Sequence, residues 1–172
     1  SERTMYNHIL SSQHPDGGFV YFTPIRPRHY RVYSQPQMGM WCCVGTGMEN
    51  HGKYGELIYT HNANDLYVNF FIPSTLNWKE KELQVQQQTT FPESEVTELK
   101  ITIKKPQQFA ILFRYPSWVK EGALKAYINK KEVTVKRNAD AYASVARVWK
   151  TGDVLTIKLP MEMRACLLYT SP

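Results

Sequence analysis

Two adjacent cysteines, Cys42 and Cys43, are the residues of this 172-residue chain whose type and spacing point most directly to chemistry. Neighbouring Cα atoms across a trans peptide lie about 3.8 Å apart, which is below the usual Cα span of a disulfide. A disulfide between the two would be strained and does not explain the pair. Two thiols presented together suit a soft metal ion such as zinc, or an activated nucleophile with a partner. Free cysteines are also often small buried residues, so the pair alone leaves simple packing open.

The residues after the pair predict a helix from about Thr46 to Thr60. Thr46 and Glu49 have the spacing of a capping box, which would make Thr46 the N-cap. Glu49 would then form an i,i+4 ion pair with Lys53. Thiols placed just before this helix would lie near its positive end, where negative charge is favoured.

Four stretches of the sequence form a pattern. They are Trp41-Cys42-Cys43 followed by Gly45-Thr46-Gly47-Met48-Glu49-Asn50-His51, then Tyr6-Asn7-His8-Ile9-Leu10-Ser11-Ser12-Gln13-His14-Pro15, Tyr21-Phe22-Thr23-Pro24 and Arg114-Tyr115-Pro116-Ser117-Trp118. The pattern resembles glycoside hydrolase family 127, the bacterial β-L-arabinofuranosidases and their relatives, over about Glu2 to Ala165. The resemblance implies an α+β chain with segregated domains. We therefore expect the C-terminal helices of an (α/α)6 barrel followed by an antiparallel β-sandwich, truncated at both ends.

The resemblance also implies a retaining glycoside hydrolase that uses a zinc-bound cysteine in place of the usual carboxylate nucleophile. Cys42 matches the nucleophile, and Cys42 and Cys43 match two zinc ligands. Two further ligands, from a Glu-x-Cys motif, and the acid/base glutamate belong upstream, so the fragment itself is expected to be inactive. Tyr21 matches a tyrosine that touches the sugar. Met40 stands where the characterised arabinofuranosidases have a histidine, which leaves the exact sugar and linkage open.

Other polar residues near the pair have simpler explanations. Glu49 and Glu56 are explained by helix capping and surface pairing, and His51 is expected to be packed or hydrogen-bonded and not a ligand. The segment from Pro24 to Gly39 is rich in proline, arginine and tyrosine and is predicted to be an ordered loop that carries polar groups to the site. Its candidates for lining a cleft are His29, Tyr30 and Tyr33.

The hydrophobic period changes from 3.6 to 2 near Asn62, which divides the chain. Residues 1–62 are assigned to the catalytic barrel, with a first helix over Glu2 to Gln13. Residues 63–165 are assigned to an incomplete β-sandwich, with Phe109 to Phe113 as a central strand. The predicted strand runs are Leu66 to Ile72, Leu83 to Val85, Leu99 to Ile103, Phe109 to Phe113, Leu124 to Ile128 and Leu155 to Leu159, and Trp78, Trp118 and Trp149 are assigned to the sandwich core or edge. Residues 166–172 resemble a translated sequencing adapter and are excluded from fold reasoning.

The charge and hydropathy of the chain argue against two classes of partner, nucleic acid and membrane. The net charge of +6 arises from scattered lysines and arginines, so we expect no nucleic-acid partner. The carbohydrate substrate is what the family resemblance implies. No apolar run approaches a membrane span, while localisation and oligomeric state stay open. The alternative function is a non-catalytic carbohydrate-binding or interaction module, a β-sandwich with a helical arm. Such a module would present a row of exposed aromatic side chains on one face of the sandwich.

Overall fold

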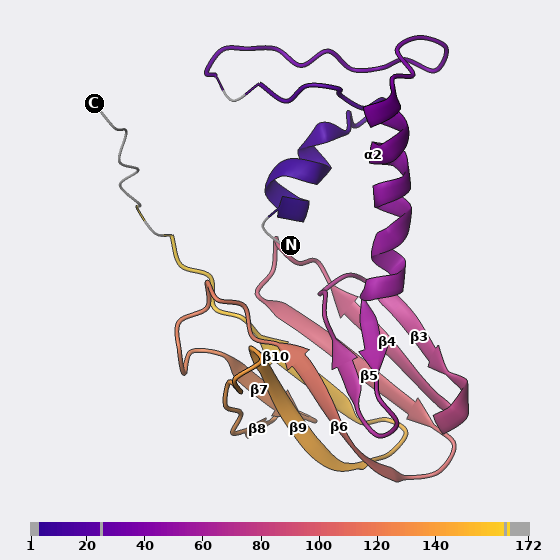
Figure 1. Ribbon diagram of the computed structural model, residues 1–172. Coiled ribbons are helices and arrows are strands. Elements are labelled where there is room, and N and C mark those ends of the chain that lie inside the picture. Colours follow the sequence, from indigo (N-terminus) through magenta and orange to yellow (C-terminus); the bar gives the residue numbers. More distant parts are fainter. Residues whose placement is uncertain (1–3, 25, 164, 166–172) are drawn as a thin grey trace. The chain divides into compact units, whose positions relative to one another are not determined.

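The computed structural model describes residues 4–24, 26–163 and 165, and the chain forms two compact units that meet between Leu57 and Ile58 (Figure 1). This division precedes the predicted boundary at Asn62. The reason is that residues just after Leu57 already form strand β1 (Tyr59–His61), which pairs antiparallel with β2 (Leu66–Val68). The predicted tail, residues 166–172, lies outside the described residues.

The first unit begins with an irregular helical segment where a regular helix was predicted. A π-helical turn, η1 (Met5–Ile9), leads into a 3₁₀ turn, η2 (Leu10–Ser12). The hydroxyl of Ser11 donates to the carbonyl of His8 at 2.8 Å, and that of Ser12 donates to the carbonyl of Ile9 at 2.6 Å. Such back-bonding competes with regular helix hydrogen bonds and bends the chain.

The helix that carries the cysteines, α2 (Cys42–Lys53), starts four residues earlier than predicted. Its N-cap is Trp41, in an extended conformation, and the Trp41 carbonyl accepts hydrogen bonds from the amides of Val44 and Gly45. The capping-box prediction is therefore wrong. The hydroxyl of Thr46 instead donates to the Cys42 carbonyl at 3.2 Å, inside the helix.

The end of this helix also differs from the prediction. After α2 the chain tightens into a 3₁₀ turn, η3 (Tyr54–Leu57), and then becomes strand, so the helix does not reach Thr60. Lys53 pairs with Glu56 at 3.7 Å, and no Lys53–Glu49 pair forms among the described residues. Both partners of the observed pair are largely exposed, so this contact contributes little to stability.

The connection from η2 to α2 is fixed by backbone bridges, in line with an ordered loop. Val20 bridges to Tyr33, and the amide of Ser34 donates to the Phe19 carbonyl at 2.9 Å. Gly18 makes this approach possible. Its φ is +89°, and a Cβ there would lie 2.3 Å from the Ser34 carbonyl oxygen, so only glycine fits.

The second unit consists of strands, with one 3₁₀ turn, η4 (Lys79–Lys81). Besides β1 and β2, its strands are β3 (Ser74–Trp78), β4 (Leu83–Thr89), β5 (Val96–Ile103), β6 (Gln107–Arg114), β7 (Lys125–Ile128), β8 (Lys131–Val133), β9 (Tyr142–Trp149) and β10 (Val154–Lys158). They form a four-stranded sheet in the order β1-β2-β6-β9 and a six-stranded sheet in the order β3-β4-β5-β10-β7-β8. The prediction of strands without a long helix between Leu66 and Pro160 is confirmed.

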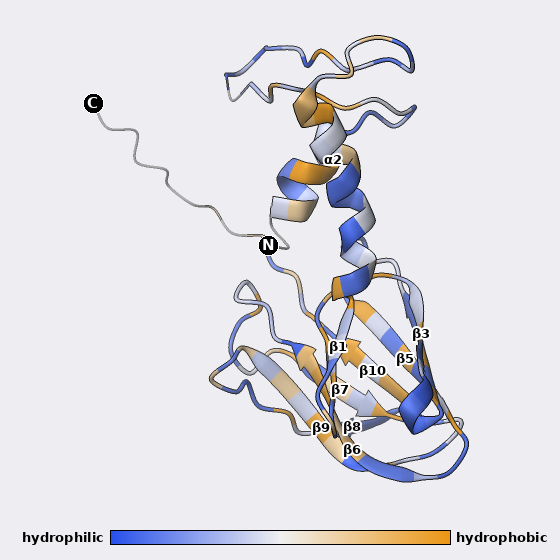
Figure 2. Ribbon diagram, turned by 45° about the vertical axis from the view of Figure 1, so that its right-hand side comes forward, coloured by the Kyte–Doolittle hydropathy of each residue, from blue (hydrophilic) through white to orange (hydrophobic). Residues whose placement is uncertain are grey.

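The two sheets share one hydrophobic core. Buried and exposed residues alternate along β4 and β5, and the colours of the strands alternate accordingly in Figure 2. Side chains from both sheets join one buried cluster, including Ile111 and Phe113 of β6 and Leu99 and Ile101 of β5. Trp149 is fully buried and Trp78 nearly so, while Trp118 packs against the edge of the cluster. These tryptophans thus occupy the core and edge positions assigned to them.

One strand pair corrects the expectation of a purely antiparallel arrangement. Strands β2 and β6 are parallel, with Leu66 opposite Ile111, whereas the other pairs are antiparallel. Between them the chain passes through β3, β4 and β5 of the other sheet and returns in the same direction. The prediction that Phe109 to Phe113 is a central strand is confirmed, because β6 lies between β2 and β9.

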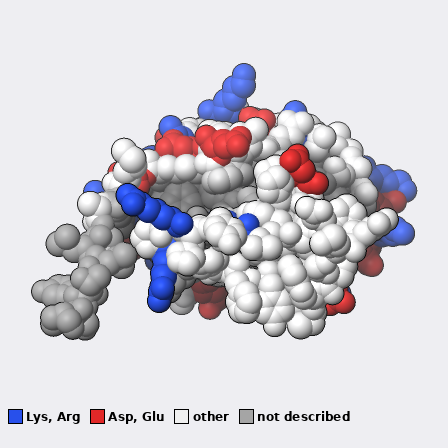
Figure 3. Space-filling model, turned by 90° about the horizontal axis from the view of Figure 1, so that it is seen from above, with Lys and Arg blue, Asp and Glu red and all other residues white. Residues whose placement is uncertain are grey.

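Charged residues of both signs are interspersed on the face drawn in Figure 3, where no single basic patch dominates. No helix among the described residues is long and apolar enough to cross a membrane.

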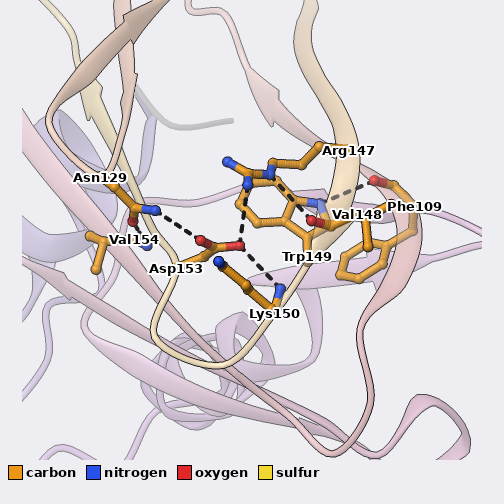
Figure 4. A network of polar contacts seen from close by, with 8 residues as sticks. All are labelled: Phe109, Asn129, Arg147, Val148, Trp149, Lys150, Asp153 and Val154. Atoms are coloured by element: carbon orange, nitrogen blue, oxygen red, sulfur yellow. Dashed lines mark hydrogen bonds and ion pairs between the residues drawn. The ribbon is translucent and has the colours of Figure 1, made fainter.

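A buried carboxylate, Asp153, ties the end of β9 to β10 and to the β7–β8 turn (Figure 4). Its side chain is 1% exposed. It accepts hydrogen bonds from the Asn129 amide at 2.8 Å and the Lys150 backbone at 3.1 Å, and it lies 3.7 Å from the Arg147 guanidinium. Burial opposes ionisation of Asp153, but these three partners outweigh it and lower the pKa of the carboxyl. The side-chain oxygen of Asn129 in turn accepts a hydrogen bond from the Val154 backbone amide at 2.9 Å.

We predict that Asp153→Ala lowers the free energy of unfolding by about 2–3 kcal/mol at pH 7, because buried donors lose a charged acceptor. Since the folded-state pKa of Asp153 is depressed, its stabilisation is present above the unfolded pKa and is lost as the pH falls through the folded one. Urea denaturation from pH 7 down to pH 3 measures this. The difference in free energy of unfolding between the natural chain and Asp153→Asn should become smaller at low pH. The variant Asp140→Ala, at an exposed site, should change the free energy of unfolding little. A gap that widens on acidification would contradict the account.

The turn between β7 and β8 yields a second prediction. Asn129 and Lys130 both have positive φ, 51° and 71°, the conformation that a two-residue type I′ hairpin turn requires. Asparagine adopts this conformation readily, whereas lysine adopts it only at a cost in free energy. Lys130→Gly should therefore raise the free energy of unfolding by roughly 0.5–1 kcal/mol, as read from the denaturation midpoint. The neighbouring Lys131→Gly, inside β8, should lower it; equal signs for the two variants would refute the turn assignment.

Candidate active site

Cys42 and Cys43 occupy the first two positions of α2, and both are free and exposed. The first amides of a helix, here those of Cys42 and Cys43, precede the residues whose amides reach a helical acceptor, so they leave a partial positive charge around the two sulfurs. This placement puts both sulfurs at the positive end of the helix. It is closer to the helix than predicted, because the cysteines are part of the first turn and do not precede it.

The two sulfurs lie close together without being bonded. Their separation is 3.9 Å, with either thiol able to donate to the other. Two thiolates bound to one tetrahedral zinc, at a Zn–S distance of about 2.3 Å, would lie about 3.8 Å apart. The pair thus fits two positions of a zinc site. Among the described residues, no group of three or more His, Cys, Asp or Glu side chains could hold a metal, so a closed four-ligand site would need two ligands besides this pair.

Tyr21 is brought to the cysteines by the bridged loop. The pKa of Tyr21 is raised, because ionising its hydroxyl would weaken its side-chain interaction with Cys43 and would bring negative charge close to the Cys43 and Cys42 sulfurs. Tyr21 also packs edge-on against Trp41, with ring centroids 6.1 Å apart. The hydroxyl therefore stays protonated at neutral pH and can donate to a thiolate or to a bound ligand.

An open pocket of about 810 Å³ in the first unit is lined in part by Tyr21 and Trp41. Its lining consists of Tyr21, Phe22, Pro24, His29, Tyr30, Val32 and Trp41. Two of the three candidates named from the loop, His29 and Tyr30, are present. Tyr33 is not, because it packs against His14 and lines a second pocket. Phe22 and Trp41 were missed as lining residues, although their aromatic character beside Tyr21 and Cys42 was a signal.

The remaining candidates have structural roles. His51 makes a 2.7 Å hydrogen bond with the Gly47 carbonyl and packs edge-on against Phe19, so the expectation of a hydrogen-bonded residue is confirmed. Glu49 is exposed on α2, and Glu56 holds Lys53. Met40 is exposed and lines the second pocket rather than the aromatic one.

Comparison with protein-family models gives two matches, one in each part of the chain. Residues 65–161 match the model of the GH127 middle domain of β-L-arabinofuranosidase, and residues 1–56 match that of the GH127 catalytic domain. The chain belongs to glycoside hydrolase family 127. A search of curated proteins gives no significant match.

Solved structures agree with this assignment. A GH127 β-L-arabinofuranosidase from Geobacillus stearothermophilus T6 superposes with a TM-score of 0.79 at 23% identity, covering 94% of this chain and 27% of that protein. A GH127 β-arabinofuranosidase gives 0.78 at 28% identity, covering 94% and 28%. A structure described as a glycoside hydrolase gives 0.77 at 28% identity, covering 99% and 30%. The chain thus spans less than a third of the length of each.

We predict that both cysteines react with iodoacetamide in the folded chain, since both are exposed and neither is bonded. Peptide mapping by mass spectrometry, in a Cys166→Ser background, measures each site. Tyr21→Phe should change the reaction rate of Cys43 more than that of Cys42, because the Tyr21 hydroxyl interacts more strongly with Cys43. Protection of either cysteine until denaturant is added would contradict the structure.

Proposed function

We propose that the chain is part of a retaining glycoside hydrolase that cleaves β-L-arabinofuranosides or related plant-glycan sugars with Cys42 as a zinc-bound nucleophile. Three observations support this. The chain belongs to family 127, the two sulfurs stand 3.9 Å apart, and both are exposed at a helix start. The sulfur separation carries the proposal, because packing alone gives no reason to present two adjacent thiols at zinc-ligand spacing.

The proposed reaction begins with attack by the Cys42 thiolate on the anomeric carbon. A C–S bond forms as the glycosidic C–O bond breaks, and the departing oxygen takes a proton from a general acid in the longer protein. Water then attacks the same carbon, giving its proton to the conjugate base of that acid, and the C–S bond breaks. Two displacements at one carbon retain its configuration.

Zinc would keep Cys42 deprotonated at neutral pH and fix its direction of attack. Cys43 would hold the same ion. The two further ligands, and the glutamate acting as acid and base, would come from the upstream Glu-x-Cys region that the family resemblance implies. On this proposal the chain is the C-terminal part of an (α/α)6-barrel domain followed by a β-sandwich, and it is inactive by itself.

Tyr21 is proposed to bind the sugar attacked by Cys42. Its hydroxyl lies at the cysteines and stays protonated, so it can donate to a sugar hydroxyl or to the sulfur. Its ring is held by Phe22 and Trp41, at centroid distances of 4.5 Å and 6.1 Å. A rigid donor beside the nucleophile helps to orient the substrate.

The alternative of a non-catalytic carbohydrate-binding module is less well supported. That reading needs a row of exposed aromatic side chains on a sheet face. In the described part of the second unit, every aromatic side chain is buried or half-buried. The large aromatic side chains that are exposed in the described chain, Tyr21, Phe22, Tyr30 and Trp41, all lie in the first unit and line one pocket.

The longer protein containing this chain tests the nucleophile. An electrophile shaped like β-L-arabinofuranose should label Cys42 and leave Cys43 unlabelled, as mapped by mass spectrometry. Cys42→Ser should abolish labelling and lower the rate by several orders of magnitude, which is typical for a lost nucleophile.

Zinc content separates the two cysteine roles, because loss of a ligand also lowers the rate. Cys43→Ser should lose zinc, measured by elemental analysis, in parallel with activity. Label on Cys43, or on a carboxylate while both cysteines stay free, would overturn the assignment.

A further inference from the structure

The aromatic pocket beside Tyr21 has a composition that the cleavage step does not require. Its volume is about 810 Å³, far larger than one pentose ring needs, and its lining contains four aromatic rings. Tyr30 is 81% exposed, and Phe22, whose ring packs edge-on against Tyr21, is 75% exposed, so in the described structure both present aromatic surface to the pocket. A site for a single small polar sugar would need more convergent hydrogen-bonding groups than His29 and the tyrosine hydroxyls.

The pocket does not include the cysteines, so it is not the place where the attacked sugar itself would lie. That sugar must touch Cys42, yet neither cysteine lines the pocket. Tyr21 and Trp41 form the connection: Tyr21 contacts Cys43, Trp41 precedes Cys42 in the chain, and both line the pocket. A substrate whose sugar rests on Cys42 would therefore have its next group beside these two rings.

Resting on the function proposed above, we propose that this pocket is the subsite for the leaving group of the glycoside, and that it selects leaving groups with a flat apolar face. Aromatic side chains bind such faces by stacking, and the face can be an aryl ring or the C–H face of a pyranose. Tyr30 and Phe22 are specificity-determining residues on this account. Trp41 has the additional task of starting α2.

Kinetics with three β-L-arabinofuranosides test the proposal in the longer protein: a methyl, a phenyl and a pyranosyl glycoside. Tyr30→Leu should lower kcat/KM for the phenyl and pyranosyl substrates by about tenfold more than for the methyl glycoside. Comparing each variant with the natural enzyme on the same substrate removes differences in leaving-group reactivity. Loss for only one of the two larger substrates identifies which face the pocket selects.

Two control variants, Tyr30→Phe and Met38→Ala, and a second test variant, Phe22→Leu, accompany this experiment. Tyr30→Phe keeps the ring and should retain the selectivity, while Phe22→Leu should lose it. Met38→Ala removes another exposed side chain, 71% exposed, from the same segment but outside the pocket lining, and should leave all three substrates unaffected. Equal losses for the three substrates in Tyr30→Leu would overturn the subsite.

Binding without turnover distinguishes failure of the subsite from failure of the proposed function. Titration of phenyl β-D-glucopyranoside into the chain should shift the NMR signal of the Trp41 indole N–H, assigned with Trp41→Phe, and Tyr30→Leu should abolish the shift. A shift without hydrolysis of any arabinofuranoside by the longer protein would overturn the function and its leaving-group role, leaving only an aromatic-lined binding pocket. Hydrolysis without a shift would overturn the subsite alone.

Discussion

The start of α2 is the constraint on which the candidate site depends. The Trp41 carbonyl takes the first hydrogen bonds of the helix, which places Cys42 and Cys43 in its first turn. Successive side chains of a helix point about 100° apart. In the first turn no preceding turn of helix lies over the two thiols, so both can be reached from the same side. At a helix start their side chains lean toward the free amide end. Local backbone geometry thus supplies both the sulfur spacing and the positive surroundings.

The loop before α2 has to bring Tyr21 to those sulfurs, and it does so through backbone contacts. Val20 bridges to Tyr33, and Phe19 and Ser34 exchange two hydrogen bonds, one of them from the Phe19 amide to the Ser34 hydroxyl at 3.0 Å. Gly18 permits the close approach of these segments. Phe19 then packs against α2, with its ring 3.3 Å from where a Cβ on Gly47 would be. Small residues in both segments therefore determine where Tyr21 lies.

The hydrophobic period predicted the all-strand character of the second unit but neither all of its strands nor the details of the first unit. Strands such as β5, with a strict two-residue alternation, were recognisable. Strand β9 was missed because alanines and Arg147 weaken its pattern, and β3 because it is polar apart from Leu76 and Trp78. The parallel β2–β6 pair depends on a crossover between sheets, which no local pattern records.

The helix start shows why a motif can mislead. Thr46 and Glu49 have capping-box spacing, but capping requires the threonine to leave helical geometry, and its hydroxyl already has an acceptor in the Cys42 carbonyl. The paired cysteines and Tyr21 were recognisable from the family pattern. Their 3.9 Å spacing was not, because it depends on where the helix begins, and the aromatic pocket was not, because it depends on how the loop folds back.

Met40 connects this geometry to specificity. The family resemblance places a sugar-binding histidine at this position, and a thioether cannot donate a hydrogen bond. In the structure Met40 also lines a different pocket from the aromatic one. On the proposed function, the methionine side chain cannot replace the hydrogen bond that a histidine at this position would make to the sugar. Among the described residues, Tyr21 is then the polar side chain beside the cysteines that can bind the sugar. Sugar binding would then depend more on Tyr21 and on apolar contacts beyond the cleaved bond, which is the part of the substrate that an aromatic pocket can hold.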